Sequence, residues 1–229
     1  MTALFITATG TDIGKTFVTA GLIRALRRAG RTVDAAKPVI SGFTLEALGA
    51  SDTGILLSAL GRDLCAEEAE RISPWRFTAP FSPDMAAEAE GTAIDFETLL
   101  ADSRTRITAA LDVLLIEGVG GIMVPLDDRH TVLDWMAALG LPVLVVAGSY
   151  LGTISHTLSA LDVLTRHGLK IAALVVSETP GSTVGREPTI ATLRRFVPAD
   201  VEVIGLPRLA GGQDHPVFER LAGLISPKT

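Results

Sequence analysis

Short apolar runs that alternate with helical patterns constrain the fold of this chain more than any other feature. Most of the runs are apolar at successive positions, which is typical of strands that are covered on both faces. Amphipathic stretches between the runs predict helices. We therefore expect an α/β fold with an open, mostly parallel sheet and helices on both faces. The runs are residues 3–8, 32–39, 112–118, 142–148, 171–177 and 201–207.

The stretch after the first run predicts an amphipathic helix. Val18 and Leu22 fall on one face of it, and Gly30 ends it. Two segments are expected to be loops: an ordered one with buried aromatic side chains at 74–83, and one that covers a ligand at 177–188. Further helices are expected at residues 52–60, 95–108, 131–139, 153–167, 189–196 and 216–224.

Length, charge and cysteine content limit the class of protein. A chain of 229 residues can bury one sizeable core, so we expect residues 1–229 to form a single domain. The net charge of -6 gives no broad attraction to nucleic acid or to an anionic membrane. The apolar runs are far shorter than the roughly 20 residues of a membrane helix, and we see no secretory signal pattern. The single Cys65 cannot form an intramolecular disulfide, which suits the cytoplasm, where we expect the protein.

The first apolar run leads into "TGTDIGKT", residues 9–16, which ends like a phosphate-binding loop. In such a loop, glycines let backbone N-H groups converge on phosphate oxygens at the start of a helix. Lys15 would neutralise phosphate charge, and the Thr16 hydroxyl can ligate magnesium. The strict spacing Gly-x-x-x-x-Gly-Lys-Ser/Thr is not met, because Thr9 stands where the first glycine belongs. An ordinary turn with an exposed lysine is the alternative.

Lys37 closes the second apolar run, and Pro38 behind it halts strand pairing. A lysine in this position can stabilise an anionic intermediate, or it can reach solvent from the edge of the sheet. Ligands of open α/β sheets bind beyond the carboxyl ends of the strands. We therefore interpret Lys37 as part of a site, with Ser41 in the loop that follows.

Two carboxylates are expected at the same edge of the sheet. Glu117 follows four apolar residues in "LLIEGVGG", so it needs a partner, for which we favour a magnesium ion over a buried salt bridge. Asp52 opens a helix next to Ser51, and capping of that helix explains it equally well. Together with Lys15 and Lys37, these carboxylates describe a site for ATP, magnesium and an anionic acceptor.

Six motifs together resemble one family of P-loop NTPases, the ATP-dependent dethiobiotin synthetases of biotin biosynthesis. The likeness covers about residues 3 to 225, in the family's order and at similar separations, although each motif alone also occurs in other P-loop proteins. The family's loop is one residue longer than the strict pattern, which explains the spacing. Ala8 and Asp12 stand where the family has glycine and glutamate. The motifs are "TGTDIGKT", "KPVISG", "SD" at 51–52, "IEGVGG", "LPVLVVAGSYLGTISH" and "GLPRL".

The resemblance implies a ligase that closes a ring. In this family, 7,8-diaminopelargonate, CO2 and MgATP give dethiobiotin, ADP and phosphate, through a carbamate and a carbamoyl-phosphate mixed anhydride. By the same resemblance, Lys15 and Thr11 meet the phosphates as catalytic residues. Lys37 meets the carbamate, and Ser41 also contacts the substrate. The implied ligands of magnesium are Thr16, Asp52 and Glu117.

The remaining contacts with ATP are implied in the same way. The nucleotide base lies near the loop after the run at 171–177 and near the segment "GLPRL". Ser177 replaces the family's asparagine there, so we expect looser selectivity for the base. The residues implied to bind ATP are Asp12, Ile13, Gly14, Lys15, Thr16, Phe17, Asp52, Glu117, Gly118, Val119, Gly120, Ser177, Glu178, Pro207, Arg208 and Leu209.

The resemblance also implies a homodimer in which the substrate carboxylate meets the start of a helix of the partner subunit. "LGTISH", residues 151–156, is similar to that start. Gly152, Thr153 and Ser155 offer N-H and hydroxyl donors with the helix dipole behind them. Plain capping of the helix is the alternative.

Three rival classes remain. A switch ATPase of the partitioning or cell-division type shares this fold, but it carries a second lysine early in the loop, and residues 8–13 contain none. An amidoligase that acts on corrinoids usually carries a further glutaminase domain with a nucleophilic cysteine, for which Cys65 gives little support. A non-enzymatic nucleotide-binding module would bind without substrate-dependent phosphate release.

Overall fold

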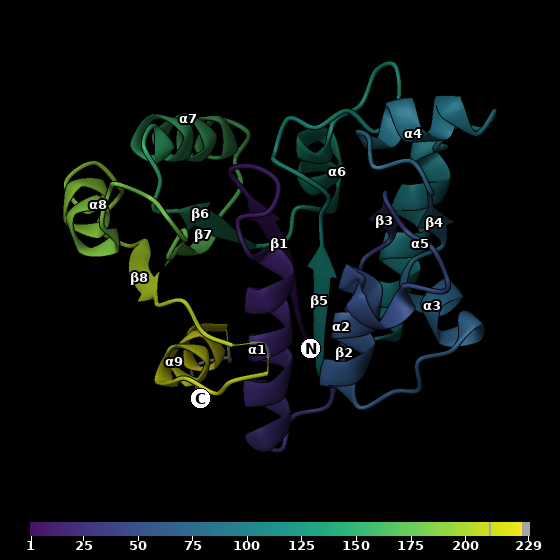
Figure 1. The fold of residues 1–229 in the computed structure, drawn as a ribbon, viewed down its shortest axis with the longest axis horizontal. Helices are drawn as coiled ribbons and strands as arrows, with labels where there is room; N and C mark the ends of the chain where they lie inside the picture. Colours follow the sequence, from purple (N-terminus) through teal and green to yellow (C-terminus); the bar gives the residue numbers. More distant parts are fainter. Residues whose placement is uncertain (211, 226–229) are drawn as a thin grey trace.

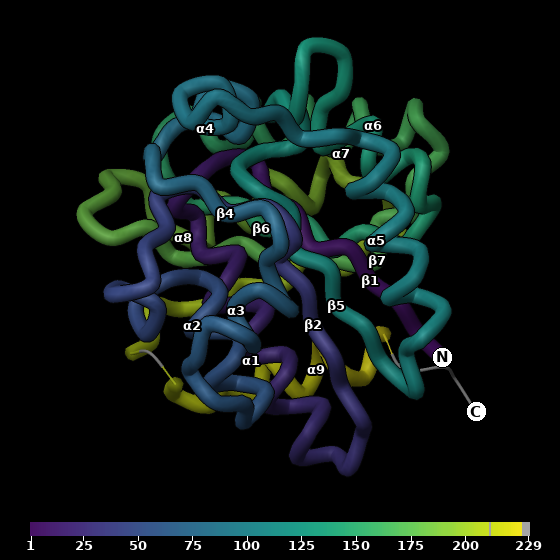
Figure 2. The backbone as a smooth tube through the Cα atoms, turned by 90° about the vertical axis from the view of Figure 1, so that its right-hand side faces the viewer, coloured from purple at the N-terminus to yellow at the C-terminus, as the bar shows by residue number. Residues whose placement is uncertain are grey.

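The computed structural model describes residues 1–210 and 212–225. Its main sheet contains β1 (Thr2–Ala8), β2 (Val33–Ala36), β5 (Val113–Glu117), β6 (Val143–Gly148), β7 (Ile171–Ser177) and β8 (Glu202–Leu206). All the pairs are parallel, and the strand order is β2-β5-β1-β6-β7-β8 (Figure 1). Figure 2 shows β1 running from the N-terminus into the interior of the fold. Because β1 lies between β5 and β6, the loop that follows it opens near the middle of the carboxyl edge of the sheet.

Helices follow most strands, as the alternating pattern predicts. They are α1 (Lys15–Arg28), α2 (Asp52–Leu60), α3 (Ala66–Ile72), α4 (Pro83–Ala89), α5 (Phe96–Ala109), α6 (Val132–Leu139), α7 (Thr153–Arg166), α8 (Arg186–Leu193) and α9 (Pro216–Ile225), with a short 3-10 helix at Leu48–Ala50. No helix in the described ranges is long and apolar enough to cross a membrane.

Two hydrophobic clusters cover the two faces of the sheet. Phe5 of β1 enters the cluster that contains residues of α5 to α8, whereas its neighbours Leu4 and Ile6 enter the cluster of α1, α2, α3 and α9. In Figure 1, α7 and α8 accordingly lie across the sheet from α9. Burial on both faces explains why β1 is apolar at successive positions. The predicted α/β architecture is confirmed.

The strand expected at residues 32–39 is in fact two short strands. β2 ends at Ala36, and β3 (Val39–Ile40) pairs in parallel with β4 (Trp75–Arg76) in a separate two-stranded sheet. Pro38 lies at the break, where its missing N-H group cannot continue the ladder of β2. Lys37 therefore stands at the carboxyl edge of the main sheet, between the two strands.

The loop expected at residues 74–83 is only partly a loop. It contains β4, and α4 begins at its last residue, Pro83, whose fixed φ suits the first helical position. Phe77 is buried, but Phe81 is 51% exposed, so the prediction of buried aromatics is wrong for Phe81. The segment at 177–188 is also shorter as a loop than expected, because α8 already begins at Arg186.

Unlike α2 and α5, α1 begins without a side-chain cap. Ser51 accepts a hydrogen bond from the backbone N-H of Gly54 at the start of α2, and Asp95 accepts one from Thr98 at the start of α5. Gly14, at the start of α1, has no side chain to do so. The first N-H groups of α1 therefore lack a side-chain cap and remain suited to bind an anion.

Candidate active site

The phosphate loop joins β1 to α1 and bends sharply. Gly14 has a φ of 101° and Asp12 has a φ of 56°, a left-handed conformation that glycine adopts freely and aspartate tolerates better than most residues. Lys15 is 7% exposed, and its Nζ donates to the carbonyl of Gly10 at 3.2 Å. The lysine thus folds back over the loop, with its ammonium group beside the backbone of Gly10.

Lys37 is only 2% exposed, which excludes the alternative of a lysine that reaches solvent. Its Nζ lies 2.9 Å from Oε1 of Glu117 and 3.0 Å from Oδ2 of Asp52. It also donates to the carbonyl of Gly118 at 3.1 Å. One ammonium group therefore joins two carboxylates, one at the end of β5 and one at the start of α2.

Glu117 is fully buried, and hydroxyl groups of α1 satisfy both of its oxygens. The Thr16 Oγ1 donates to Oε1 at 2.7 Å, and the Thr19 Oγ1 donates to Oε2 at 2.5 Å. Lys37 supplies the opposite charge. The buried salt bridge, the alternative to a metal ligand in the sequence, is thus present, and its cation is Lys37.

The lysines and carboxylates of the site shift one another's pKa values. Burial, helped by repulsion from Lys37, lowers the pKa of Lys15 to about 8, although nearby carboxylates oppose the shift. Burial alone would lower the pKa of Lys37, but Glu117 and Asp52 raise it above the ordinary lysine value. Burial would likewise raise the pKa of Asp52, but the positive charge of Lys37 lowers it. Lys37 and Asp52 are therefore charged at neutral pH.

One cavity of about 330 Å³ opens onto this cluster. It brings together segments that are far apart in the sequence, as the strand-end argument predicts. Ile40 is the one lining residue that the sequence did not indicate. The lining residues are Thr11, Asp12, Gly14, Lys15, Thr16, Lys37, Ile40, Ser41, Asp52, Val119 and Gly120.

Two residues of the predicted loop face away from this cavity. The ring of Phe17 lies against Phe218 of α9, with 5.9 Å between the ring centroids, and Ile13 packs against the hydrophobic cluster under α1. Only their backbone groups remain as candidate phosphate contacts.

The residues predicted near the nucleotide base gather at the ends of β7 and β8. The Glu178 carboxylate accepts a hydrogen bond from the backbone N-H of Arg208 at 3.0 Å, and Pro207 and Leu209 flank Arg208. Ser177 lies beside the phosphate loop, because a Cβ atom added to Gly14 would sit 3.3 Å from the Ser177 hydroxyl. The residues predicted near the base therefore lie next to the phosphate loop, but they do not line the cavity that contains Lys37.

The residues predicted to bind the substrate carboxylate are not brought to that cavity. Gly152, Thr153 and Ser155 form the start of α7, and none of them lines it. Thr153 is buried, and its hydroxyl donates to the carbonyl of Gly148 at 2.7 Å, as a helix-start contact within the chain. Ser155 is exposed. Within a single chain these residues do not form one site with Lys37.

The donor atoms around Glu117 fit magnesium. Thr16, Asp52 and Glu117 offer hydroxyl and carboxylate oxygens, which Mg²⁺ prefers. Thr16 donates its single hydrogen to Glu117, so its lone pairs remain free for a cation. The described part of the chain contains no cluster of three or more His, Cys, Asp and Glu residues. Such an ion would therefore depend on phosphate oxygens of a nucleotide as well.

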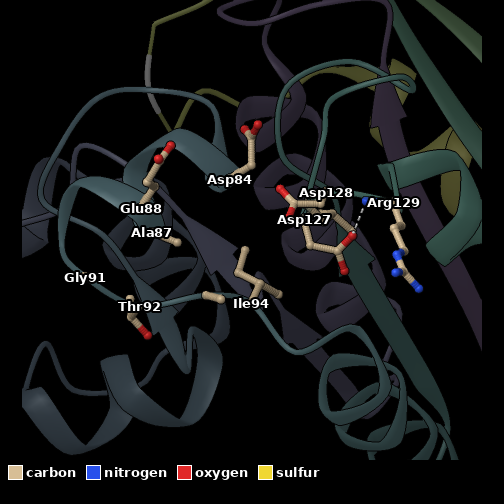
Figure 3. Close-up of a pocket in the computed structure, with 11 residues that line it drawn as sticks. Asp84, Ala87, Glu88, Gly91, Thr92, Ile94, Asp127, Asp128 and Arg129 are labelled. Carbon is tan, nitrogen blue, oxygen red and sulfur yellow. Dashed lines mark hydrogen bonds between the residues drawn. The ribbon is translucent and has the colours of Figure 1, made fainter.

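A second cavity, of about 560 Å³, lies elsewhere and contains none of the predicted site residues. Figure 3 shows Asp84 and Glu88 on one side of it and Asp127, Asp128 and Arg129 on the other. A dashed line marks the hydrogen bond from the backbone N-H of Arg129 to Asp127. This cavity has no basic cluster or glycine loop, so it does not compete with the first as a nucleotide site.

Sequence reasoning missed Thr19, which contacts Glu117 from the second turn of α1. A signal was available, because residues three apart lie on the same face of a helix, and Thr19 stands three positions after Thr16. Its importance depends on β5 lying beside α1, which no local pattern reveals.

A parallel sheet whose inner strand leads into a Gly-Lys-Thr loop at an uncapped helix start defines a P-loop nucleotide-binding protein. The family profile described as an AAA domain matches residues 2–210. The cell division ATPase MinD of Pyrococcus furiosus aligns with a TM-score of 0.57 at 18% identity, over 98% of each chain. The receptor FtsY of Elizabethkingia anophelis aligns with a TM-score of 0.51 at 14% identity, over 98% of this chain and 65% of that one. At such identities these likenesses show the fold alone.

Other relatives are much more similar to this chain in sequence than these two solved structures are. The ATP-dependent dethiobiotin synthetase of Acidiphilium cryptum is 49% identical over 200 residues, which are 87% of this chain and 90% of that protein. That of Methylobacterium nodulans is 45% identical over 216 residues, 92% of this chain and 95% of that protein. The chain therefore belongs to the ATP-dependent dethiobiotin synthetase family, which confirms the resemblance seen in its motifs.

Proposed function

We propose that this protein is a ligase that closes the ureido ring of dethiobiotin from 7,8-diaminopelargonate, CO2 and ATP, with release of ADP and phosphate. The single observation that carries the proposal is that Lys15, Lys37 and Asp52 line one cavity, with Glu117 paired to Lys37. Such a site suits an ATP-dependent reaction that passes through an anionic intermediate. Family membership names the reaction.

The chemistry requires charge stabilisation at each step. One amine of the substrate adds to CO2 and loses a proton, which gives a carbamate. A carbamate oxygen takes the γ-phosphoryl group, which releases ADP, and the second amine then attacks the carbonyl carbon, which releases phosphate and closes the ring. Lys15 and Thr11 bind the phosphates, and Lys37 with Ser41 orients the carbamate.

Magnesium would be held by Thr16, Asp52 and Glu117, and would neutralise charge on the phosphate oxygens. In the ligand-free protein the Lys37 ammonium supplies the positive charge between the two carboxylates. The buried Glu117 is therefore never left without a cation, before or after the nucleotide binds.

Three further parts of the proposal rest on the family. The nucleotide base lies against Ser177, Glu178 and the segment 207–209, next to the phosphate loop. The protein acts as a homodimer, in which Gly152, Thr153 and Ser155 of one subunit bind the substrate carboxylate held by the other. Each subunit is a single domain, residues 1–229, that works in the cytoplasm.

Phosphate release from MgATP tests the proposal. We expect release only when diaminopelargonate and bicarbonate are both present, together with dethiobiotin identified by mass. Lys37→Ala should abolish product formation, whereas Lys170→Ala, at an exposed lysine, should not. ATP turnover that is equal without the diamine refutes the ligase, and turnover stimulated by DNA or a membrane instead favours a switch ATPase.

A further inference from the structure

Thr19 occupies a position that no part of the proposed reaction yet uses. It lies on α1, one turn beyond Thr16, and is fully buried. Its hydroxyl is 2.5 Å from Oε2 of Glu117 and 3.0 Å from the carbonyl of Lys15. A hydroxyl has one hydrogen and donates it to one acceptor at a time. The nearer acceptor is a carboxylate, which makes the stronger bond, so the hydrogen goes to Glu117.

The two oxygens of Glu117 are held unequally. Oε1 accepts hydrogen bonds from both Thr16 and Lys37. Among the residues that the structure describes, Oε2 accepts one from Thr19 alone. Rotation of the carboxylate about its last bond would carry Oε1 away from Thr16 and Lys37. The hydrogen bond from Thr19 to Oε2 therefore opposes this rotation.

From this geometry we infer that Thr19 is a positioning residue, which orients Glu117 so that its Oε1 faces the metal position beside Thr16. Thr19 itself touches neither nucleotide nor substrate. The inference rests on the proposed function only in taking Glu117 as a metal ligand. Groups that orient metal ligands in this way typically change metal affinity by about 10–100-fold when they are removed.

A structural role offers a different explanation of the same threonine. A buried threonine in a helix often bonds only to the carbonyl four residues earlier, here that of Lys15, and serves packing alone. Loss of such a bond would alter stability but would leave the preference for metal unchanged. The two roles therefore differ in a measurement of metal binding.

The test compares Thr19→Ser with Thr19→Ala, which differ only in the hydroxyl group. Mn²⁺ is titrated into each variant with a non-hydrolysable ATP analogue, and bound Mn²⁺ is read by electron paramagnetic resonance, without turnover. We expect Thr19→Ala to bind Mn²⁺ about 10–100-fold more weakly than Thr19→Ser. The affinity for the analogue in excess chelator should be the same in both variants.

Thr157 provides a matched control. It is also a fully buried helical threonine, and its hydroxyl has no hydrogen-bond partner within the described residues. Thr157→Ser and Thr157→Ala should bind Mn²⁺ equally. If Thr19→Ala does not fold, Thr19→Cys keeps the size of the side chain with a much weaker donor, and the same direction of loss is expected.

The outcomes separate the inference from the proposed function. If Thr19→Ser and Thr19→Ala bind Mn²⁺ with equal affinity, the positioning role is overturned. It is also overturned if Thr19→Ala binds the ATP analogue more weakly than Thr19→Ser does and the loss is the same with and without metal. If the unmodified protein shows no analogue-dependent binding of Mn²⁺, the proposed metal site itself is wrong, and the inference fails with it.

Discussion

The Lys37 ammonium lies 2.9 Å from Oε1 of Glu117, and both groups are almost completely buried. A buried carboxylate without a cation is strongly unfavourable, so this pair makes a folded ligand-free site possible. The same lysine also contacts Asp52 at 3.0 Å. One ammonium group therefore holds together the two carboxylates that we propose as ligands of magnesium.

Replacing Lys37 by methionine should destabilise the ligand-free protein. Lys37→Met keeps most of the side chain but leaves Glu117 buried without its cation, which should lower the free energy of unfolding by about 3–5 kcal/mol. Denaturation in urea measures this loss.

Lys170→Met is the control for that comparison, since Lys170 is exposed. It should change the free energy of unfolding by no more than about 0.5 kcal/mol. If Lys37→Met is as stable as Lys170→Met, the buried pair of Lys37 and Glu117 does not stabilise the fold.

Binding of ATP should take up a proton above pH 8. The pKa of Lys15 is lowered to about 8 in the ligand-free protein, so the lysine is mostly neutral at pH 9. Bound phosphates favour the charged form and raise this pKa, so ATP binding is accompanied by protonation of Lys15. We expect uptake of about 0.5 proton at pH 8 and about 0.9 at pH 9, with affinity falling as the pH rises.

Calorimetry in buffers of different ionisation enthalpy measures this uptake, at pH values where ATP itself is fully deprotonated. Lys15→Arg is the control, because arginine remains charged throughout this range and should show no uptake. Binding of ATP at pH 9 with no proton uptake by the unmodified protein would contradict the lowered pKa of Lys15.

Ser177 should permit a broad choice of nucleotide. Its single hydroxyl cannot provide the paired donor and acceptor that an amide offers to adenine. We expect kcat/KM for GTP and CTP to lie within about tenfold of the value for ATP. Ser177→Asn should increase the preference for ATP by about tenfold, the effect of one or two added hydrogen bonds. Ser177→Thr, which keeps a hydroxyl, should leave the preference unchanged, and strict use of ATP by the unmodified protein would refute the idea.

The sequence predicted the parts of the site that depend on local pattern. The loop before Lys15 is recognisable from its glycines, and Glu117 stands out because a carboxylate after an apolar run needs a partner. The identity of that partner was not predicted, since Lys37 reaches Glu117 only because β2 pairs with β5. Thr19 was missed for the same reason.

Among the helices and strands as well, the sequence predicts what depends on local pattern and misses what depends on distant pairing. The longer helices, such as the one at Phe96–Ala109, are predicted to within one residue, because their patterns and caps are local. The short helices Ala66–Ile72 and Pro83–Ala89 were missed, since seven residues are too few to show a helical period. The predicted strand at 32–39 is too long, because its last residue, Val39, pairs instead with Trp75 of a strand that the sequence did not indicate.

Because α1 packs closely against α9, any side chain larger than hydrogen at Gly21 should destabilise the protein. A Cβ atom at Gly21 would lie 2.2 Å from the ring of Phe218, which is itself buried and packs against Phe17. Gly21→Ala should therefore lower the free energy of unfolding by about 1–3 kcal/mol, even though alanine favours a helix more than glycine does. Gly223→Ala, in α9, meets no atom within 4 Å and should raise it by about 0.5–1 kcal/mol.

Urea denaturation tests whether the clash with Phe218 causes the loss of stability. The variants to compare are Gly21→Ala, Gly223→Ala, Phe218→Leu and Gly21→Ala combined with Phe218→Leu. The smaller leucine makes room for the added methyl group, so the double variant should be more stable than the sum of the two single changes predicts. Strict additivity would mean that the contact between Gly21 and Phe218 does not limit the approach of the two helices. Because α1 carries Lys15 and Thr19, this contact also fixes the helix on which the phosphate loop depends.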